Sequence, residues 1–377
     1  MKDEDIYQEW FTKKNLSKGT RRTYMVAIES YKKYTGKSLS ELIDEAEEEE
    51  DKSLRMRKRK INKYIIGFKA HLEDSGLAPG SIKNKMSAVI SLYQSFEIQT
   101  PQINLPKGDI CLEKNYNTPP TREEIQSMIN VSDARDAAII YTMALTGLAS
   151  KEIRNITVRK YLESAEKAIN RDLDSIEDLF EYEDEILGEV LTLDIVREKV
   201  HYRHQTFIPP ETNRAIISYI KWRHNNRNAK RHITDLDGKL FITKSGMPMS
   251  RTGVGNSIRR RGKQAGFKSK GEGAYRYWRP HSLRKYFIST IINNTGNHIL
   301  ADYLAGHKID DVKRAYWHAD PEALKDDYLK VLPYLSIDKA KVKDVSSKEF
   351  KTLNQKINYL EKLLADKEYA KETIKKV

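Results

Sequence analysis

Four residues in the last third of the sequence have the types and order needed for an oxygen to attack a phosphate diester. His281 and Arg284 form a His-x-x-Arg pair. His307 follows a glycine, and Tyr316 stands nine residues beyond it. A guanidinium stays charged and binds phosphate through two parallel hydrogen bonds, imidazoles transfer protons, and a tyrosine oxygen can bond covalently to phosphorus. Each residue alone is better explained as a helix cap, an ion pair or a half-buried aromatic; the ordered set indicates chemistry.

The segments HSLRKYF (281–287) and LAGHKIDDVKRAYWH (304–318) resemble the conserved boxes of the tyrosine recombinase, or phage-type integrase, family. The resemblance extends over most of the chain and is most specific in this last third. Within the family, the chain resembles the site-specific recombinases of archaea or archaeal viruses, which are carried by mobile elements. The resemblance implies that Tyr316 cleaves DNA and forms a 3′-phosphotyrosyl intermediate. A DNA 5′-hydroxyl then attacks this intermediate and reverses the cleavage step. The resemblance also implies that Arg284 clamps the phosphate while His281 and His307 bind it or relay protons. No metal or cofactor is implied.

Two of these assignments have rivals in the sequence. The resemblance implies a lysine that protonates the leaving 5′-oxygen, and we expect Lys199, in the turn of a predicted hairpin, rather than Lys244. Tyr328 is the competing nucleophile, but two aspartates precede it and would repel an incoming phosphate. We therefore favour Lys199 and Tyr316.

The first family box departs from its pattern at one position. The family reads Thr-Gly-Leu-Arg there, whereas this chain has Thr-Gly-Leu-Ala, with Ala149 at the position of the expected arginine. Arg154 lies five residues on and, in a helix, would project roughly 140° away. Loss of one phosphate donor lowers rates by about 10²–10³-fold. The chain is therefore expected to be impaired, as an inactivated variant or a natural degenerate member, and the intact remainder favours the first. A type IB-like topoisomerase and a non-catalytic DNA-binding protein of the same fold remain alternatives.

The elements that must position these residues are mainly helical, with one small antiparallel β-sheet, which gives an α+β fold class. Residues 1–100 predict a helical core-binding domain that clamps DNA, and residues 101–117 a linker. Residues 118–343 predict the catalytic domain, in which 161–189 form an acidic inserted helical pair and 190–210 a hairpin or three-stranded sheet. Residues 344–377 carry an amphipathic helix about two heptads long, a possible link between protomers.

Charge and composition agree with a polyanionic partner. The chain has 67 lysines and arginines against 54 acidic residues, a net charge of +13. We expect double-stranded DNA with a specific recombination site as the partner, a homotetramer on paired sites, and a monomer or weak oligomer when the protein is free. The residues predicted to contact DNA are Arg21, Arg22, Arg57, Arg59, Lys60, Lys83, Lys85, Arg259, Arg260, Arg261 and Lys263.

Several features bear on where the protein acts. The sequence has no apolar run of membrane-spanning length, and its N-terminus lacks the apolar core of a signal peptide. A single cysteine, Cys111, excludes an internal disulfide and has no assigned role. The expectation is a cytoplasmic, nucleoid-associated protein that uses no metal.

Overall fold

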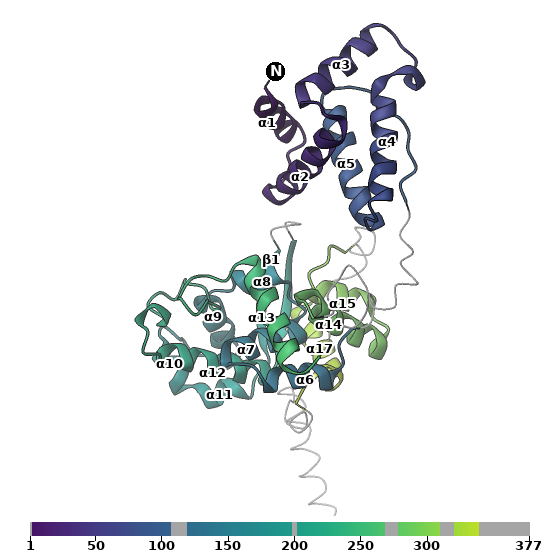
Figure 1. Ribbon diagram of the computed structural model, residues 1–377. Coiled ribbons are helices and arrows are strands. Elements are labelled where there is room, and N and C mark those ends of the chain that lie inside the picture. The colour runs from purple at the N-terminus through teal and green to yellow at the C-terminus, as the bar shows by residue number, and fades with distance from the viewer. Residues whose placement is uncertain (1, 107–118, 198–201, 268–277, 310–319, 339–377) are drawn as a thin grey trace, which may run out of the picture. The chain divides into compact units, whose positions relative to one another are not determined.

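The computed structural model describes residues 2–106, 119–197, 202–267, 278–309 and 320–338 (Figure 1). It divides into two compact units, Met1–Glu113 and Lys114–Val377. Cys111, Lys199, Tyr316 and the predicted C-terminal helix of 344–377 lie outside the described residues. The chain is mainly helical with one small antiparallel sheet, which confirms the predicted fold class.

The first unit is helical throughout its described part. Its elements are α1 (Asp3–Lys13), α2 (Lys18–Thr35), α3 (Leu39–Asp51), the 3-10 turn η1 (Met56–Lys58), α4 (Lys60–Asp74) and α5 (Pro79–Ser95). The Ser17 hydroxyl accepts from the Thr20 amide at 3.2 Å and so begins α2, which ends at Gly36 in the left-handed region. The apolar stripe of α4, formed by Ile61, Ile65, Phe68 and Leu72, is buried and belongs to this unit's core with the other helices.

The second unit contains the remaining helices and the sheet. Its first helices are α6 (Arg122–Asn130), α7 (Ala134–Thr146), α8 (Ser150–Asn155), α9 (Val158–Ile169), α10 (Ile176–Glu181) and α11 (Glu183–Leu187). Strands β1 (Leu191–Arg197) and β2 (Tyr202–Ile208) follow, and then α12 (Pro210–His224), η2 (Ala229–Arg231), α13 (Arg251–Gln264), α14 (Pro280–Thr295), α15 (His298–Leu304) and α17 (Pro321–Leu335). The strands pair antiparallel, with Leu191 opposite Ile208, so the described residues form the hairpin alternative.

The acidic segment 161–189 folds as three short helices rather than the expected pair. Asn170 adopts the left-handed conformation and ends α9, and a Ser175 capping box then begins α10. Leu162, Leu173 and Leu179 are fully buried in the core of the second unit. In Figure 1 these helices lie beside α12 at one end of that unit. The segment is therefore part of the fold, and its acidic residues form the outer side.

Helix α7 is the centre of the second unit. Every residue from Ala138 to Thr146 is buried, and α6, α12, α14 and β2 pack against it (Figure 1). A helix that is apolar all round requires such neighbours on every side. The carboxyl end of α7 consequently lies inside the unit, where α8, α14 and the hairpin meet. None of the helices in the ranges that the structure describes is long and apolar enough to cross a membrane.

Candidate active site

The candidate site is built around the glycine that ends α7. Gly147 adopts φ +69°, and a Cβ added there would lie 2.4 Å from the ring of Phe287 on α14. Only a glycine allows this turn and this close packing together. Helix α14 therefore packs directly against the end of α7, and the Gly147 carbonyl is available to a side chain one helical turn before Phe287.

That side chain is Arg284, the arginine of the predicted His-x-x-Arg pair. Its Nη1 donates to the Gly147 carbonyl at 2.7 Å, and the residue is 3% exposed. Its Nη2 atom has no hydrogen-bond partner among the described residues. Burial, followed by the nearby charge of Arg197, lowers the pKa of Arg284 to about 10. The guanidinium thus stays charged at neutral pH and keeps one buried donor for an incoming group.

Ala149 is the N-cap residue of α8 and provides no side-chain cap for it. Three residues on, the carboxylate of Glu152 is buried, and its Oε1 lies 3.5 Å from Nε of Arg197 at the end of β1. Arg154 donates to the Ser150 carbonyl at 3.0 Å, within its own helix. The Nε of Arg154 is therefore bonded within its own helix. Arg197 was not predicted, because its place in the site depends on a contact between residues 45 positions apart.

The second family box brings a further glycine and a histidine to the same place. Gly306, at φ +69°, follows α15, and its carbonyl accepts from Nη1 of Arg197. Nδ1 of His307 is 2.7 Å from a carboxylate oxygen of Asp302. When Asp302 accepts a proton-bearing Nδ1, the lone pair resides on Nε2, which is then the nitrogen able to accept a proton. The Gly306–His307 segment is thus fixed from both sides.

His281 lies in the first turn of α14, one turn before Arg284. The side chain is exposed and is not the helix cap, since Arg279 occupies that position. Partial desolvation, then the charges of Arg279, Lys285 and Arg284, lowers the pKa of His281. His307 contributes to the same shift, so the two predicted histidines are close in space. His281 is therefore neutral at pH 7.

A third histidine, His204 on β2, lies at the back of the site and was also missed by the sequence. It is 1% exposed, and neither ring nitrogen has a hydrogen-bond partner among the described residues. A Cβ added at Gly306 would lie 2.6 Å from its ring. Burial, followed by the charges of Arg284 and Arg197, lowers its pKa to about 4. Alternation along β2 would have placed His204 on the inward face, but not beside Gly306.

The structure shows where the two rivals in the predicted set lie. Tyr328 is fully buried, and its hydroxyl donates to the Leu145 carbonyl at 2.9 Å. Lys244 lines a hollow with Asp133, the N-cap of α7, whereas Arg284 contacts the other end of that helix, about 20 Å away by helical rise. Lys199 falls in the connection between β1 and β2, two residues after Arg197 in sequence. Tyr328 is thus enclosed in the core and Lys244 lies towards the far end of α7, while Lys199 and Tyr316 are outside the described residues.

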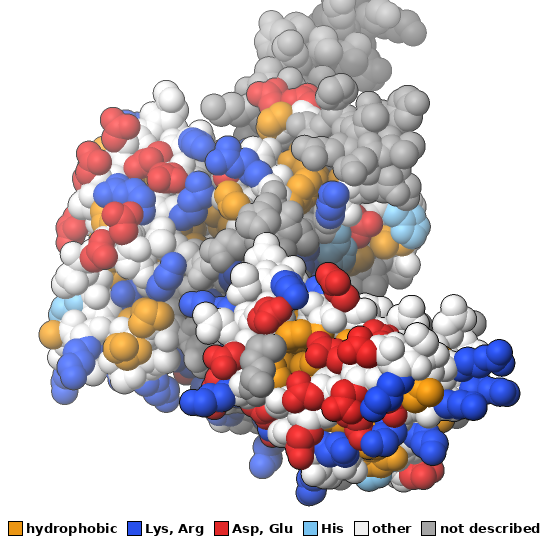
Figure 2. All heavy atoms as spheres, turned by 90° about the horizontal axis from the view of Figure 1, so that it is seen from above, with side chains coloured by type: hydrophobic (Ala, Val, Ile, Leu, Met, Phe, Trp, Pro, Cys, Tyr) orange, Lys and Arg blue, Asp and Glu red, His pale blue; other side chains and the backbone are white. Residues whose placement is uncertain are grey.

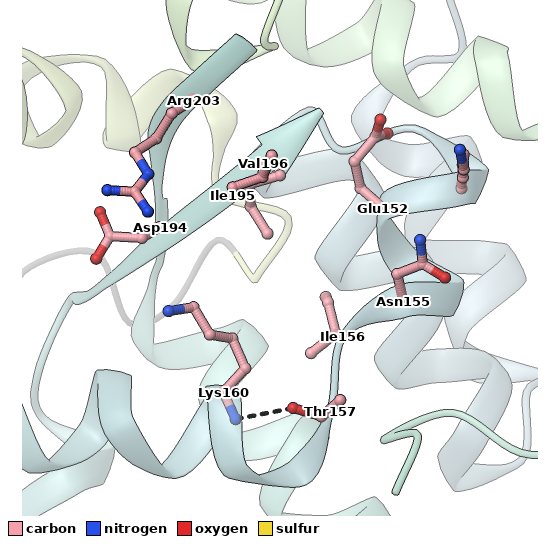
Figure 3. A pocket seen from close by; sticks show the side chains of 10 residues that line it. Glu152, Asn155, Ile156, Thr157, Lys160, Asp194, Ile195, Val196 and Arg203 are labelled. Carbon is pink, nitrogen blue, oxygen red and sulfur yellow. Dashed lines mark hydrogen bonds between the residues drawn. The ribbon is translucent and has the colours of Figure 1, made fainter. Parts of the chain in front are cut away.

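A hollow lies between the hairpin and the segment of α8 and α9 (Figure 3). It is lined by Lys151, Glu152, Asn155, Ile156, Thr157, Lys160, Asp194, Ile195, Val196 and Arg203. In Figure 3 the Glu152 carboxylate points away from Lys160, whose amide donates to Thr157 Oγ1 at 3.1 Å. Glu152 therefore lies between this hollow and Arg197. Among the described residues, no group of three or more histidine, cysteine or acidic side chains is arranged to hold a metal.

The predicted DNA-contacting residues of the first unit differ in how freely they are exposed. Arg22, Arg57 and Lys83 are exposed. Arg21 donates to the Leu16 carbonyl and lies over the Phe11 ring, Lys60 pairs with Glu45, and Lys85 donates to Ser30. Arg59 is buried, with bonds to the Leu54 carbonyl and to Glu50. The guanidinium of Arg59 is occupied in joining α3 to α4, so we remove it from the proposed DNA surface.

Helix α13 packs against α8 and carries the second predicted basic group. Arg259 and Lys263 are exposed, whereas Arg260 is half-exposed and pairs with Asp136 at 2.8 Å. Arg261 is buried, with its Nε 2.7 Å from the same carboxylate. Arg261 therefore has a structural role, and the outward residues Arg259, Arg260 and Lys263 remain. On the face shown in Figure 2, cationic side chains stand among acidic ones, so charge alone does not mark a binding face.

Comparisons with known proteins identify the family and support the fold. The profile described as the phage integrase family matches residues 121–323. No curated protein matches the sequence. A lambda integrase dimer bound to a core site superposes with a TM-score of 0.54 at 14% identity, covering 83% of this chain and 93% of that one. The Tn1549 transposon integrase in complex with a circular-intermediate DNA superposes with a TM-score of 0.54 at 16% identity, covering 88% and 99%. At these identities the likeness concerns the fold.

Proposed function

Because the chain belongs to the phage integrase family of tyrosine recombinases, we propose that it is a site-specific DNA recombinase that cleaves and rejoins DNA through a 3′-phosphotyrosyl intermediate at Tyr316. The observation that supports this most is the convergence of the described members of the predicted set. Arg284, His281 and His307 come from two boxes more than 20 residues apart, and they meet at the end of α7. A cationic cluster with free buried donors suits a phosphate diester.

The proposed reaction assigns one task to each residue. Arg284 binds the non-bridging oxygens of the phosphate as their charge grows. The oxygen of Tyr316 attacks phosphorus, the bond to the 5′-oxygen breaks, and Lys199 gives that oxygen a proton. His281, neutral at pH 7, and His307, oriented by Asp302, hydrogen-bond the phosphate or relay the tyrosine proton. A 5′-hydroxyl of a second DNA strand reverses these steps and completes the exchange.

The proposed partner is double-stranded DNA with a specific recombination site. Exposed cations on the first unit and on α13 would contact its phosphates, which positions the protein without reading sequence. We further propose a homotetramer on paired sites, in which residues 345–377 dock on a neighbouring protomer. A lambda integrase tetramer bound to a Holliday junction, similar in fold to this chain, supports this assembly.

Ala149 favours a second candidate, a DNA-binding protein of the same fold that does not cleave. An alanine cannot bind a phosphate oxygen, and the loss of one donor costs about 10²–10³-fold in rate if no other group replaces it. The two candidates differ in one product, the covalent adduct.

The test begins with selection of binding sites from random DNA and continues with a suicide substrate nicked beside the scissile phosphate. The recombinase forms a covalent protein–DNA adduct in the presence of EDTA, and Tyr316→Phe forms none. Tyr328→Phe, which loses one buried hydroxyl, is the matched control and keeps the adduct. Exchange between two sites then separates a recombinase from an enzyme that only relaxes supercoils. Specific binding with no adduct, even in the Ala149→Arg variant, would establish the non-cleaving candidate.

A further inference from the structure

We infer that Arg197 supplies the second guanidinium of the phosphate-binding site, in place of the side chain that Ala149 lacks. The inference rests on the proposed function and deepens it, since it identifies which group takes over a task that the family assigns to another position. It starts from where Glu152 holds the Arg197 side chain.

Glu152 connects Arg197 to the position of the missing arginine. Ala149 is the N-cap of α8, and Glu152 is the third residue of that helix. In a capping box the side chain at each of these two positions bonds the backbone amide of the other residue, so the two side chains lie close together. Because Nε of Arg197 is 3.5 Å from Glu152, its guanidinium occupies the neighbourhood that a long side chain at position 149 would enter. The cation is present, but it arrives from the hairpin instead of from α8.

The opposite edge of the guanidinium faces the second family box. Nη1 of Arg197 donates to the carbonyl of Gly306, the residue before His307. Arg197 is also the largest charge influence on Arg284 and a further one on His204, so all three are close in space. Arg197 therefore lies amid the groups proposed to bind the phosphate, in contact with both segments that carry them.

Buried cations outnumber buried carboxylates in this cluster. Arg284 and Arg197 face a single buried carboxylate, that of Glu152, while His204 is neutral at pH 7. Two guanidiniums this close repel each other where solvent is largely excluded, and an anion between them relieves that repulsion. One phosphodiester carries one negative charge. The buried part of the cluster therefore favours an anion such as a DNA phosphate, while the carboxylate of Asp302, which also acts on Arg284, is half-exposed.

Both arginines also keep donors that could reach the phosphate oxygens. Within the described ranges, Nη2 of Arg284 has no hydrogen-bond partner, while Arg197 contacts Gly306 and Glu152 through its Nη1 and Nε atoms, which leaves its Nη2 for a further acceptor. The Arg197 side chain is 16% exposed, so it is both fixed and accessible. Donors held in place before the substrate arrives stabilise developing charge without further reorganisation.

A different explanation is that Arg197 only joins the hairpin to the Gly306 segment. The two explanations differ in whether the guanidinium interacts with the phosphate charge, which a neutral methylphosphonate at the scissile position removes. In a Tyr316→Phe background no cleavage occurs, and the affinities for DNA with the two linkages can be compared. The parent is expected to prefer the charged linkage by about tenfold or more. Arg197→Ala is expected to reduce this preference by about tenfold.

Two further variants guard against a folding artefact. Arg197→Gln keeps a donor near the Gly306 carbonyl but removes the charge, and it should show the same reduced preference. Arg171→Ala is the matched control, since Arg171 pairs with Glu185 at 3.2 Å in the acidic segment, and its preference should equal the parent's. If Arg197→Ala and Arg197→Gln both prefer the charged linkage as strongly as the parent, the inference is overturned.

The rate of adduct formation offers a second, independent measurement in the protein that retains Tyr316. Arg197→Ala should slow adduct formation by about 10²–10³-fold. Adding Ala149→Arg to that variant should restore most of the rate, because an arginine again occupies the same neighbourhood. A hairpin brace predicts no restoration, and that result would also overturn the inference. If the parent itself forms no adduct, the proposed cleavage fails, while the methylphosphonate comparison still decides the role of Arg197.

Discussion

Gly306→Ala should unfold the second unit more easily and should do so through His204. The added methyl group would lie 2.6 Å from two atoms of the buried His204 ring, closer than Cβ atoms are found to approach. The φ of +69° adds a separate cost, since an alanine rarely adopts the left-handed region. Both effects act on the backbone of Gly306, whose carbonyl accepts from Arg197. Gly306 also directly precedes His307.

The magnitude follows from these two causes. A non-glycine residue in the left-handed region costs about 1–2 kcal/mol. Overpacking a filled interior costs about 1–3 kcal/mol, and His204 has little room to move because it is 1% exposed. The expected loss in free energy of unfolding is about 2–5 kcal/mol. Adduct formation should fall as well, because the Arg197 and His307 segments move with the backbone.

The free energy of unfolding is measured from the urea-induced unfolding transition of the second unit, with Gly296→Ala as the matched control. Gly296 has φ +67° in the same unit, and an added Cβ would meet nothing within 4 Å, so this variant reports the backbone cost alone. In the Gly306→Ala background, His204→Ala should recover about 1–3 kcal/mol relative to additivity. If Gly306→Ala is no more damaging than Gly296→Ala, or if the two changes at 204 and 306 simply add, the reasoning about this contact is refuted.

Two further predictions concern buried charge in the second unit. His204 has a pKa of about 4 in the folded chain against 6.5 when unfolded, so the unfolded chain binds more protons between these values. Stability should therefore be complete above pH 6.5 and fall by about 3 kcal/mol as the pH drops toward 4, a slope that His204→Phe should reduce in urea titrations; an unchanged slope would contradict this. Asp136→Asn should cost about 3–5 kcal/mol, since it leaves Arg135, Arg260 and Arg261 without their shared buried carboxylate. Asp327→Asn, at an exposed pair with Lys330, should hardly move the unfolding transition, and equal effects of the two substitutions would argue against the buried network.

Local patterns in the sequence determined the elements and the identity of the candidate residues. Helix starts such as Ser17 and helix ends such as Gly147 depend on hydrogen bonds between near neighbours, so residue type and spacing suffice to locate them. Residue type and spacing likewise suffice to identify His281, Arg284 and His307 as candidates. The helical pair expected in the acidic segment was wrong in number, because the left-handed turn at Asn170 adds a break that apolar periodicity does not show.

Only the tertiary structure decided which charges meet. Arg59 and Arg261 looked like surface cations, yet carboxylates and carbonyls from other elements enclose them. Arg197 carried no signal in its own segment, since its partners, Glu152 and Gly306, lie 45 and 109 positions away. Periodicity reports which side of an element faces the core, whereas the contact between two charges depends on how separate elements pack. For that reason the sequence indicated a phosphate site that lacks an arginine at 149, and the fold placed another arginine beside it.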